Sequence, residues 1–551
     1  MNISRAILGN FLLFTSIVSL AKASVSDATC PEIEIYGGKF FNSKTGEQFF
    51  MKGIAYQPQR TLEDLEEGAG IFETKYVDPL ADTSLCLRDI PYLRKLDVNT
   101  IRVYSVDPTK NHDVCMEELK KAGIYVILDL SEPDLSITRD HPEWDVDLLN
   151  RYKSVVDAMH SYSNVLGFFA GNEVTNDDTN TDASPFVKAA IRDTKKHIRE
   201  QGYRAIPVGY STNDDAETRA ALAQYFICGD VTADFYGINM YEWCGYSSYG
   251  TSGYKERTEE FEGYPIPIFF SEFGCNAIRP RPFTEVSALF SEEMSSTWSG
   301  GLVYMYFEED NGYGVVKAEG ENVYELDDFD TLQKQYSKAR PKGTTKEEYA
   351  KNWQKSNDIV SSCPPKTEVW KATDRLPATP DLLKCSCLEE VLPCIMTAHE
   401  DNEKYVELFS YICSQVDCSD IAADGVTGIY GEYSDCSITQ KLSLQYSKLY
   451  TLRSSKNGVC PNSDANKLYF NPRSLHKFDK YDKCNARAKK VEELLSKSSR
   501  TGSGEGDTSD SIHKRTNKPK DGKSQKSGST QQRGSGYVIL FVSVFIASIL
   551  L

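Results

Sequence analysis

The sequence is poor in features that define several other classes of protein. Its seven histidines are scattered and never come close together as zinc ligands do, which argues against a histidine-built metal site. Lysine and arginine number 62 against 80 aspartate and glutamate residues, and a net charge of −18 argues against a protein that mainly grips a nucleic-acid backbone. The 36 glycines and 22 prolines are too few for a collagen-like or wholly low-complexity chain.

What the chain does contain points to several folded units in an oxidising compartment. At 551 residues it is long enough for more than one domain, and its 40% hydrophobic residues supply ample core. Fifteen cysteines are many for a cytosolic enzyme. We therefore expect disulfides and a secreted protein.

The first residues predict a secretory signal peptide at 1–23. Arg5 provides a small positive region, an apolar stretch follows, and Ala21-Lys22-Ala23 has the small-x-small pattern of a cleavage site. A buried helix is the alternative, and the position and cleavage pattern favour the signal.

The last residues predict a glycolipid (GPI) anchor signal. Tyr537–Leu551 is uncharged, ends the chain, and is shorter than the roughly 20 residues that span a bilayer. A polar spacer and the small residues Ser527-Gly528-Ser529 precede it. We place attachment near Ser527, with Ser524 or Gly528 as alternatives. A conventional tail anchor is less consistent with the N-terminal signal, so we expect a lipid-anchored protein on the outer face of the plasma membrane.

Between these ends the chain alternates strand-like apolar runs with amphipathic helical patterns. Helices are expected at Leu148–Ser161, Phe186–Glu200 and Phe283–Met294. Eight such strands predict an α/β fold, one (β/α)8 barrel. A doubly wound sheet would usually carry a Gly-rich phosphate turn after its first strand, and none is present. The expected strands are Phe49–Gln57, Thr100–Tyr104, Tyr125–Leu130, Val165–Val174, Ile206–Ser211, Phe235–Trp243, Ile266–Gly274 and Gly300–Glu308.

The region after the barrel is rich in cysteine. Eight cysteines within roughly a hundred residues predict a disulfide-stapled module, because CxxC knuckle pairs typical of zinc clusters are missing. Eight cysteines allow 105 pairings, so the spacing leaves their connectivity open. They are Cys385, Cys387, Cys394, Cys413, Cys418, Cys436, Cys460 and Cys484.

These observations divide the chain into six segments. Ser, Gly and Lys dominate the stretch before the tail, which is typical of a flexible stalk. The expected segments are a signal peptide (1–23), a catalytic barrel (24–345), a connecting segment (346–380), a cysteine-rich module (381–490), a stalk (491–530) and a removed tail (531–551).

Two glutamates end apolar strands of the expected barrel. Glu173 follows Gly171-Asn172 at the fourth strand, and Glu272 lies near the end of the seventh. Catalytic groups of such barrels project from the carboxyl ends of strands. A carboxylate there is costly unless it is solvated or paired. The pair predicts a glycosidase, in which one carboxylic acid protonates the leaving oxygen and the other carboxylate attacks the sugar.

The strand-end motifs resemble glycoside hydrolase family 72, the fungal β-1,3-glucanosyltransferases anchored at the cell surface. The resemblance covers nearly the whole mature chain, and the cysteine-rich region looks like the carbohydrate-binding module of one branch of that family. The matching segments are Cys86-Leu-Arg-Asp-Ile, Ile101-Arg-Val-Tyr104, Asp129-Leu-Ser-Glu-Pro133, Gly171-Asn-Glu-Val174, Tyr236-Gly-Ile-Asn-Met-Tyr-Glu-Trp-Cys244 and Ser271-Glu-Phe-Gly-Cys275.

The resemblance implies a role for each matching position. Glu173 would be the acid/base and Glu272 the nucleophile of a retaining enzyme, with Asn172 bonding the donor sugar and Tyr241 orienting Glu272. The remaining substrate-binding residues implied are Gln59, Tyr104, Asp129 and Tyr304 at donor subsites and Tyr313 on the acceptor side. Two carboxylates suffice for this chemistry, so no cofactor and no metal are expected.

Cysteines within the barrel are expected to form three disulfides. Cys244 lies three residues after Tyr241 and Cys275 three after Glu272, on neighbouring strands, so equal offsets predict a Cys244–Cys275 bond at the rim. The family resemblance implies Cys86–Cys115 and Cys228–Cys363 as well. Cys30 is left without an obvious partner.

The function expected from the resemblance is transfer: internal cleavage of β-1,3-glucan and joining of the new reducing end to the non-reducing end of another chain. This reaction would elongate the glucan of a fungal cell wall, where the protein is expected to act. A mainly hydrolytic endo-β-1,3-glucanase has the same residues and is the first alternative. A wall-binding protein with an inactive barrel is the second, and the retention of both Glu173 and Glu272 argues against it. Composition alone does not separate transfer from hydrolysis.

Overall fold

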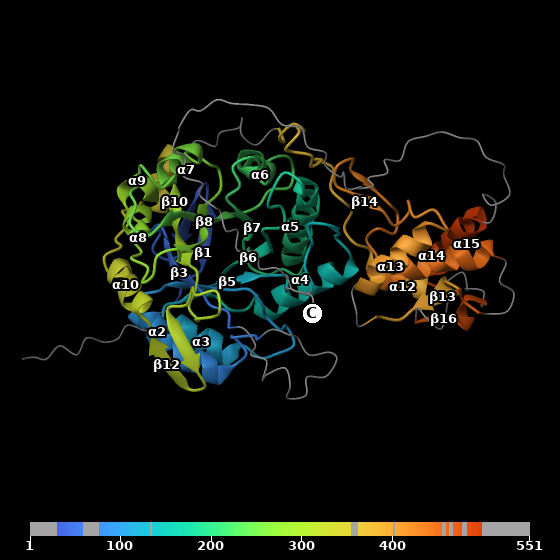
Figure 1. Ribbon diagram of the computed structural model, residues 1–551, viewed down its shortest axis with the longest axis horizontal. Helices are drawn as coiled ribbons and strands as arrows, with labels where there is room; N and C mark the ends of the chain where they lie inside the picture. The colour runs from blue at the N-terminus through green and yellow to red at the C-terminus, as the bar shows by residue number, and fades with distance from the viewer. Residues whose placement is uncertain are drawn as a thin grey trace, which may run out of the picture. The chain divides into compact units, whose positions relative to one another are not determined.

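The computed structural model describes most of the chain between residues 30 and 498 (Figure 1). The described ranges are 30–58, 77–132, 135–353, 362–399, 403–453, 459–461, 467–475 and 482–498. The predicted signal peptide, Gln59, the stalk beyond residue 498, Ser527 and the C-terminal tail lie outside these ranges.

Eight parallel strands close into one barrel, which confirms the (β/α)8 prediction. The strands follow one another around the barrel in chain order, and the last pairs with the first through Val303 opposite Ile54. Three strands start at the predicted residue, and the other boundaries differ by one to five residues, because apolar character does not mark where strand pairing begins or ends. The barrel strands are β3 (Met51–Ala55), β4 (Thr100–Val103), β5 (Tyr125–Asp129), β6 (Val165–Asn172), β7 (Val208–Asn213), β8 (Tyr236–Cys244), β9 (Ile268–Cys275) and β10 (Trp298–Val303).

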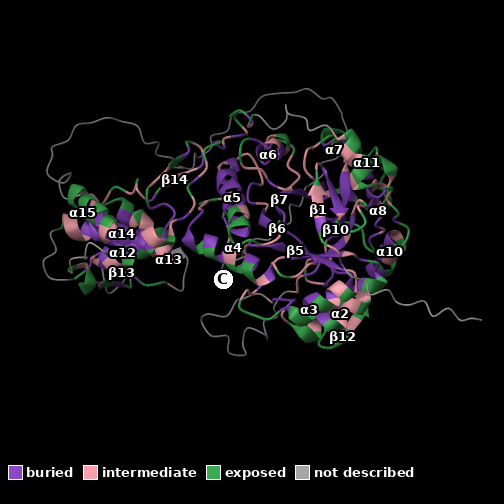
Figure 2. Ribbon diagram, turned by 180° about the vertical axis from the view of Figure 1, so that it is seen from behind, coloured by how far each residue is buried: buried purple, intermediate pink, exposed green. Residues whose placement is uncertain are grey.

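Helices cover the outside of the barrel, and α5 and α4 bury most of their inward faces (Figure 2). Asp145 caps α4 by accepting hydrogen bonds from two backbone N–H groups, and Pro185 lies in the first turn of α5, where its missing N–H costs nothing. The helices are α2 (Thr83–Lys95), α3 (Asp113–Lys121), α4 (Val146–Met159), α5 (Ser184–Glu200), α6 (Arg219–Tyr225), α7 (Tyr254–Glu260), α8 (Glu285–Leu289), α9 (Glu292–Ser295), α10 (Asp327–Tyr336) and α11 (Lys346–Asn352), with a 3₁₀ turn, η1, at Thr181–Ala183.

The expected single helix at Phe283–Met294 is wrong in detail. The chain forms two short helices, α8 and α9, separated at Phe290 and Ser291. Ser291 has an extended backbone (ψ 167°), which interrupts the helix. Serine favours helix starts over helix interiors, and Ser291 precedes the first residue of α9. The amphipathic pattern of the sequence runs through this break and therefore did not reveal it.

The end of the barrel opposite the strand carboxyl ends is filled by aromatic side chains. Phe235 and Phe269 pack against Phe169 and against Phe40 from an N-terminal hairpin, β1 (Ile33–Tyr36) and β2 (Lys39–Asn42). Each of the four phenylalanines is fully buried. A side chain at Gly209 would meet Phe235 at 2.4 Å, so glycine is required there. Because this end of the barrel is filled, a catalytic site is expected at the carboxyl ends of the strands.

The C-terminal region forms a small helical module. Its longest helix, α14, starts with a capping box in which Ser437 and Gln440 bond each other's backbone, and it is buried from Gln440 to Leu449. The remaining elements are α12 (Leu382–Val391), α13 (Glu403–Cys413), α14 (Ile438–Leu452), α15 (Asn485–Ser498), η2 (Pro472–Leu475) and the short strands β13 (Cys394–Met396), β14 (Ala423–Asp424), β15 (Ile429–Tyr430) and β16 (Leu468–Phe470). Another hairpin, β11 (Val316–Glu319) and β12 (Asn322–Glu325), belongs to the barrel region.

The barrel and the module share specific contacts. Val146 at the start of α4 packs in the module's core, and its N–H bonds the carbonyl of Asp435 at 2.9 Å. Lys441 of α14, 1% exposed, reaches Glu143 at 2.7 Å. Trp370 of the connecting segment is buried in the barrel's own core. The segment between the two regions is therefore part of the barrel's packing.

Seven disulfides link fourteen of the cysteines. The barrel bonds join Cys86 to Cys115, Cys228 to Cys363 and Cys244 to Cys275, as expected, and Cys30 is buried and free. The structure also gives the connectivity that the spacing left open: Cys385–Cys436, Cys387–Cys484, Cys394–Cys460 and Cys413–Cys418. Among the described residues, no helix has the length and apolar character needed to cross a membrane.

Candidate active site

Glu173 stands directly after β6 in a constrained backbone conformation. Its φ of 48° lies in the left-handed region, which is costly for a side chain other than glycine's. Its N–H bonds the Ser211 carbonyl at 2.9 Å, and its own carbonyl accepts from Arg139 at 2.6 Å. These two bonds fix the direction in which the carboxylate leaves the strand.

Glu272 lies within β9 and is 8% exposed. The Tyr104 hydroxyl donates to Oε1 at 2.8 Å and the Tyr241 hydroxyl donates to Oε2 at 2.9 Å. Burial raises the pKa of Glu272 to about 7, the charge of Glu173 adds to that rise, and Arg102 and the two hydroxyls oppose it. Three protein donors on one carboxylate therefore favour its ionised form against the effect of burial.

A fully buried arginine that sequence reasoning did not single out connects the site. Arg102 of β4 donates to both oxygens of Asp129 at 3.0 Å, to Asn172 Oδ1 at 3.0 Å and to Glu272 Oε1 at 3.3 Å. Burial opposes its charge, but Asp129, Tyr104 and Glu272 raise the pKa of Arg102. A charged residue in the middle of a short apolar strand was the signal that could have revealed it.

Three further polar side chains missed by the sequence analysis lie in neighbouring strands. Asn239 of β8 donates to Glu173 Oε1 at 2.8 Å and to Asn172 Oδ1 at 3.2 Å. Ser211 and Ser271 lie behind its amide oxygen, at 3.2 and 2.8 Å. Small polar residues inside buried strands were again the available signal.

The predicted substrate-binding tyrosines gather beside Glu272. The Tyr313 ring packs edge-on against Tyr304, with 5.3 Å between centroids, and against Tyr241 at 6.0 Å. Arg281, which is buried, donates to the backbone carbonyls of Tyr304 and Tyr313 at 2.6 and 2.5 Å. An aromatic wall therefore lines one side of the site.

Two other predicted residues, the buried Asp129 and the half-buried Asn172, make hydrogen bonds to neighbouring side chains. Asp129 is 3% exposed with both oxygens on Arg102, and the Asn172 amide oxygen accepts from Arg102 and Asn239. Their contacts in the structure are with the protein, and contact with sugar stays a prediction for both.

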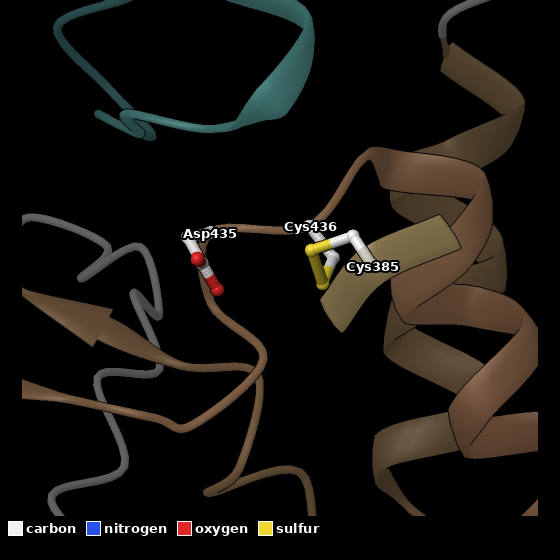
Figure 3. A group of neighbouring side chains, drawn as sticks. All are labelled: Cys385, Asp435 and Cys436. Carbon is white, nitrogen blue, oxygen red and sulfur yellow. A yellow bond between two sulfur atoms is a disulfide. The ribbon is translucent and has the colours of Figure 1, made fainter. Parts of the chain in front are cut away.

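Ligand-type side chains come together at one place among the described residues, away from the two glutamates. Cys385, Asp435 and Cys436 lie within 4.8 Å of one another (Figure 3). The two sulfurs are bonded to each other, and Asp435 accepts from Lys384 and from the Asp381 backbone. A disulfide sulfur is not a thiolate ligand, so the group is a structural staple.

The geometry at the strand ends defines a class of enzyme. The barrel has a floor closed by aromatic rings, an aromatic wall, and glutamates at the fourth and seventh strands that share one hydrogen-bond network. These are the features of a barrel glycosidase with paired carboxylates.

Comparison with known proteins identifies the family. Residues 22–340 match the glucanosyltransferase family, glycoside hydrolase family 72, and residues 392–467 match the X8 domain. The chain belongs to the glucanosyltransferase family and carries an X8 domain after the barrel.

Close relatives cover almost the whole chain. It is 56% identical to 1,3-beta-glucanosyltransferase GAS2 of Saccharomyces cerevisiae over 97% of this chain and 96% of that protein. It is 49% identical to pH-responsive protein 2 of Candida albicans over 83% of this chain and 81% of that protein.

Solved structures agree with this relationship. A ligand-free variant of S. cerevisiae Gas2p superposes with a TM-score of 0.81 and 59% identity, covering 85% of this chain and 98% of that one. A complex of Gas2p with laminaritetraose and laminaripentaose superposes with a TM-score of 0.77 and 59% identity, covering 84% and 99%.

Proposed function

We propose that the protein is a retaining 1,3-β-glucanosyltransferase in which Glu272 is the nucleophile and Glu173 the general acid/base. The observation that carries this is the hydrogen-bonded chain Glu173–Asn239–Asn172–Arg102–Glu272, which holds two carboxylates from distant segments around one site. Laminari-oligosaccharides bound to Gas2p support a β-1,3-glucan substrate.

The first step forms a glycosyl-enzyme. A Glu272 oxygen attacks the anomeric carbon, the glycosidic C–O bond breaks, and Glu173 gives its proton to the departing oxygen. Arg102 and the hydroxyls of Tyr104 and Tyr241 favour the ionised Glu272 that this attack needs.

The second step releases the glycosyl group. The 3-hydroxyl of another glucan chain attacks the same carbon, Glu173 takes the hydroxyl proton, and the bond to Glu272 breaks. Bond types are exchanged one for one, so no energy-carrying donor is needed. Transfer exceeds hydrolysis only if a sugar occupies the acceptor side, where Tyr313, packed against Tyr304, presents an aromatic face suited to sugar C–H surfaces.

The roles of the remaining residues follow from the family resemblance, and the location of the protein follows from the two ends of its sequence. Tyr104, Tyr304, Asn172, Asp129 and Gln59 are assigned to donor subsites. The signal peptide, the small residues near Ser527 and the apolar tail support a GPI-anchored protein at the cell surface, acting on wall glucan.

Product length tests the function. Incubation with a reduced laminari-oligosaccharide should yield products longer than the substrate, whereas shorter products alone would indicate the hydrolytic alternative. Glu173→Gln and Glu272→Gln should each reduce turnover by roughly a thousandfold or more while glucan binding survives. Wild-type-like turnover in either variant would refute the assignment.

A further inference from the structure

The amide of Asn239 connects Glu173 to the side chains that reach Glu272, and Asn239 is buried, at 4% exposure. Its nitrogen is 2.8 Å from Glu173 Oε1 and 3.2 Å from Asn172 Oδ1. Its oxygen faces the hydroxyls of Ser271 and Ser211, which lie 2.8 Å from each other. The Asn239 amide is therefore hydrogen-bonded at both ends.

The orientation of the amide follows from its neighbours. A guanidinium only donates, so Arg102 requires Asn172 to present its oxygen. An oxygen already facing Arg102 accepts a second bond from Asn239, whose nitrogen must therefore point that way. The second hydrogen of that nitrogen is directed at Glu173 Oε1. A flipped amide would place oxygen against oxygen at both positions.

The serines support the same orientation from behind. Arg102 Nη1 lies 3.5 Å from Ser211 Oγ, which places a donor on that oxygen. Ser211 can then donate to Ser271, and Ser271 to the Asn239 oxygen. One charged side chain thus polarises both ends of the amide.

We propose that Asn239 is a positioning residue that fixes which oxygen of Glu173 carries the catalytic proton. This inference rests on the proposed acid/base role of Glu173. Because Asn239 donates to Oε1, a hydrogen on Oε1 would meet another hydrogen, and the acidic proton resides on Oε2. Oε2 gives that proton to the leaving oxygen in the first step and receives the acceptor's proton in the second.

The same bond serves both steps. When Glu173 is ionised, the Asn239 bond becomes charge-assisted and holds the carboxylate for the incoming proton. When Glu173 is protonated on Oε2, Oε1 is a carbonyl-type acceptor and the bond persists. Loss of the donor would leave the proton distributed over two oxygens, only one of which faces the sugar.

The test uses the full chain carrying Asn239→Ala, with Asn239→Asp as an isosteric variant that keeps the shape and replaces the amide nitrogen by an oxygen. Two donors separate acid catalysis from other effects: a laminari-oligosaccharide, whose leaving group needs a proton, and a 2,4-dinitrophenyl β-laminarioligosaccharide, whose leaving group does not. Both variants should cleave the oligosaccharide about 10- to 100-fold more slowly than wild type. The burst of dinitrophenol should stay within about threefold of wild type, because general acid catalysis adds little there.

Azide provides a second readout, because it attacks the glycosyl-enzyme without a general base. Turnover of the aryl donor by the Asn239 variants should rise with azide and yield a β-glycosyl azide. Asn213→Ala is the matched control: this β7 asparagine bonds the Asn176 carbonyl at 2.7 Å, and its loss should leave both donors unaffected.

The outcomes are distinguishable. Equal losses with both donors and no azide rescue would overturn the inference, as would wild-type cleavage of the oligosaccharide. If Asn239→Ala fails to fold, Asn239→Asp decides by the same criteria, and if that also misfolds the residue is structural and the inference fails. Glu173→Ala is measured alongside. If it lacks leaving-group dependence and azide rescue, the proposed acid/base role falls; if it shows both and the Asn239 variants do not, only the inference falls.

Discussion

Glu272 shows how single side chains set a catalytic charge. Burial raises its pKa to about 7, whereas a guanidinium and two tyrosine hydroxyls pull the pKa down. A nucleophile must be ionised, so these donors decide how acidic a medium the enzyme tolerates. Two tyrosines of the aromatic wall beside it are held through their backbone, because Arg281 donates to the carbonyls of Tyr304 and Tyr313.

Replacing Tyr241 by phenylalanine should raise the lowest pH at which the enzyme is active. The hydroxyl stabilises the ionised form, so its loss raises the pKa of Glu272, and less nucleophile is ionised at a given pH below neutrality. The acid limb of kcat/KM should move upward by about 1 pH unit, the equivalent of roughly 1.4 kcal/mol. Tyr152→Phe, whose hydroxyl bonds the Ala170 carbonyl, is the control and should leave the limb in place. An unchanged or downward-shifted limb in Tyr241→Phe would contradict this reading.

At the scale of elements, β8 and β9 supply much of the site. The two strands contribute Asn239, Tyr241, Ser271 and Glu272, and just beyond them Cys244 pairs with Cys275. The disulfide closes a loop with a sequence separation of 31 residues. It therefore ties together the two strands whose ends must stay in register for Tyr241 to reach Glu272.

Removing this disulfide should affect both stability and activity. The variant with Cys244→Ala and Cys275→Ala should lose about 2–4 kcal/mol of unfolding free energy and several-fold in transfer rate, measured by denaturant unfolding and product analysis. The Cys413→Ala, Cys418→Ala pair spans a separation of only 5 residues in the module and serves as the control. It should be less destabilising and leave the rate unchanged. If the variant without the Cys244–Cys275 bond transfers glucan at the normal rate at temperatures where it stays folded, the two strands hold their register without the disulfide.

At the scale of the molecule, the connecting segment belongs to the barrel. Trp370 is 1% exposed within the barrel's core, and the Tyr225 hydroxyl bonds the Thr373 carbonyl at 2.6 Å. The module adds its own contacts through Val146 and the Lys441–Glu143 pair. Barrel and module are thus linked by buried surface as well as by chain.

Two truncations should separate these contributions. A chain ending after Cys363 keeps every barrel disulfide but loses Trp370, and should be about 3–5 kcal/mol less stable than one ending after Pro380. The longer truncation should in turn be less stable than the full chain, because Val146 becomes exposed. Denaturant unfolding of the three proteins gives the order. Equal stability of the two truncations would show that the connecting segment contributes nothing to the barrel.

Much of this architecture could be read from the sequence. Eight buried parallel strands appear as continuous apolar runs, so the barrel, and Glu173 and Glu272 at the ends of two of those strands, followed from local pattern. Strand boundaries and the break between α8 and α9 did not, because apolar character continues where backbone geometry changes. Arg102 and Asn239 escaped notice because a polar residue within an apolar run carries no sign of what faces it.

The chain by itself therefore determined the order of strands, the position of two acidic residues at strand ends and the even set of cysteines in the module, because each depends on residues near one another in sequence. Only the tertiary structure decided which atoms meet: the pairing of eight cysteines, the arginine beneath Glu272, and the asparagine against Glu173. Those contacts join segments tens to hundreds of residues apart, and closing the barrel is what brings them within hydrogen-bonding distance.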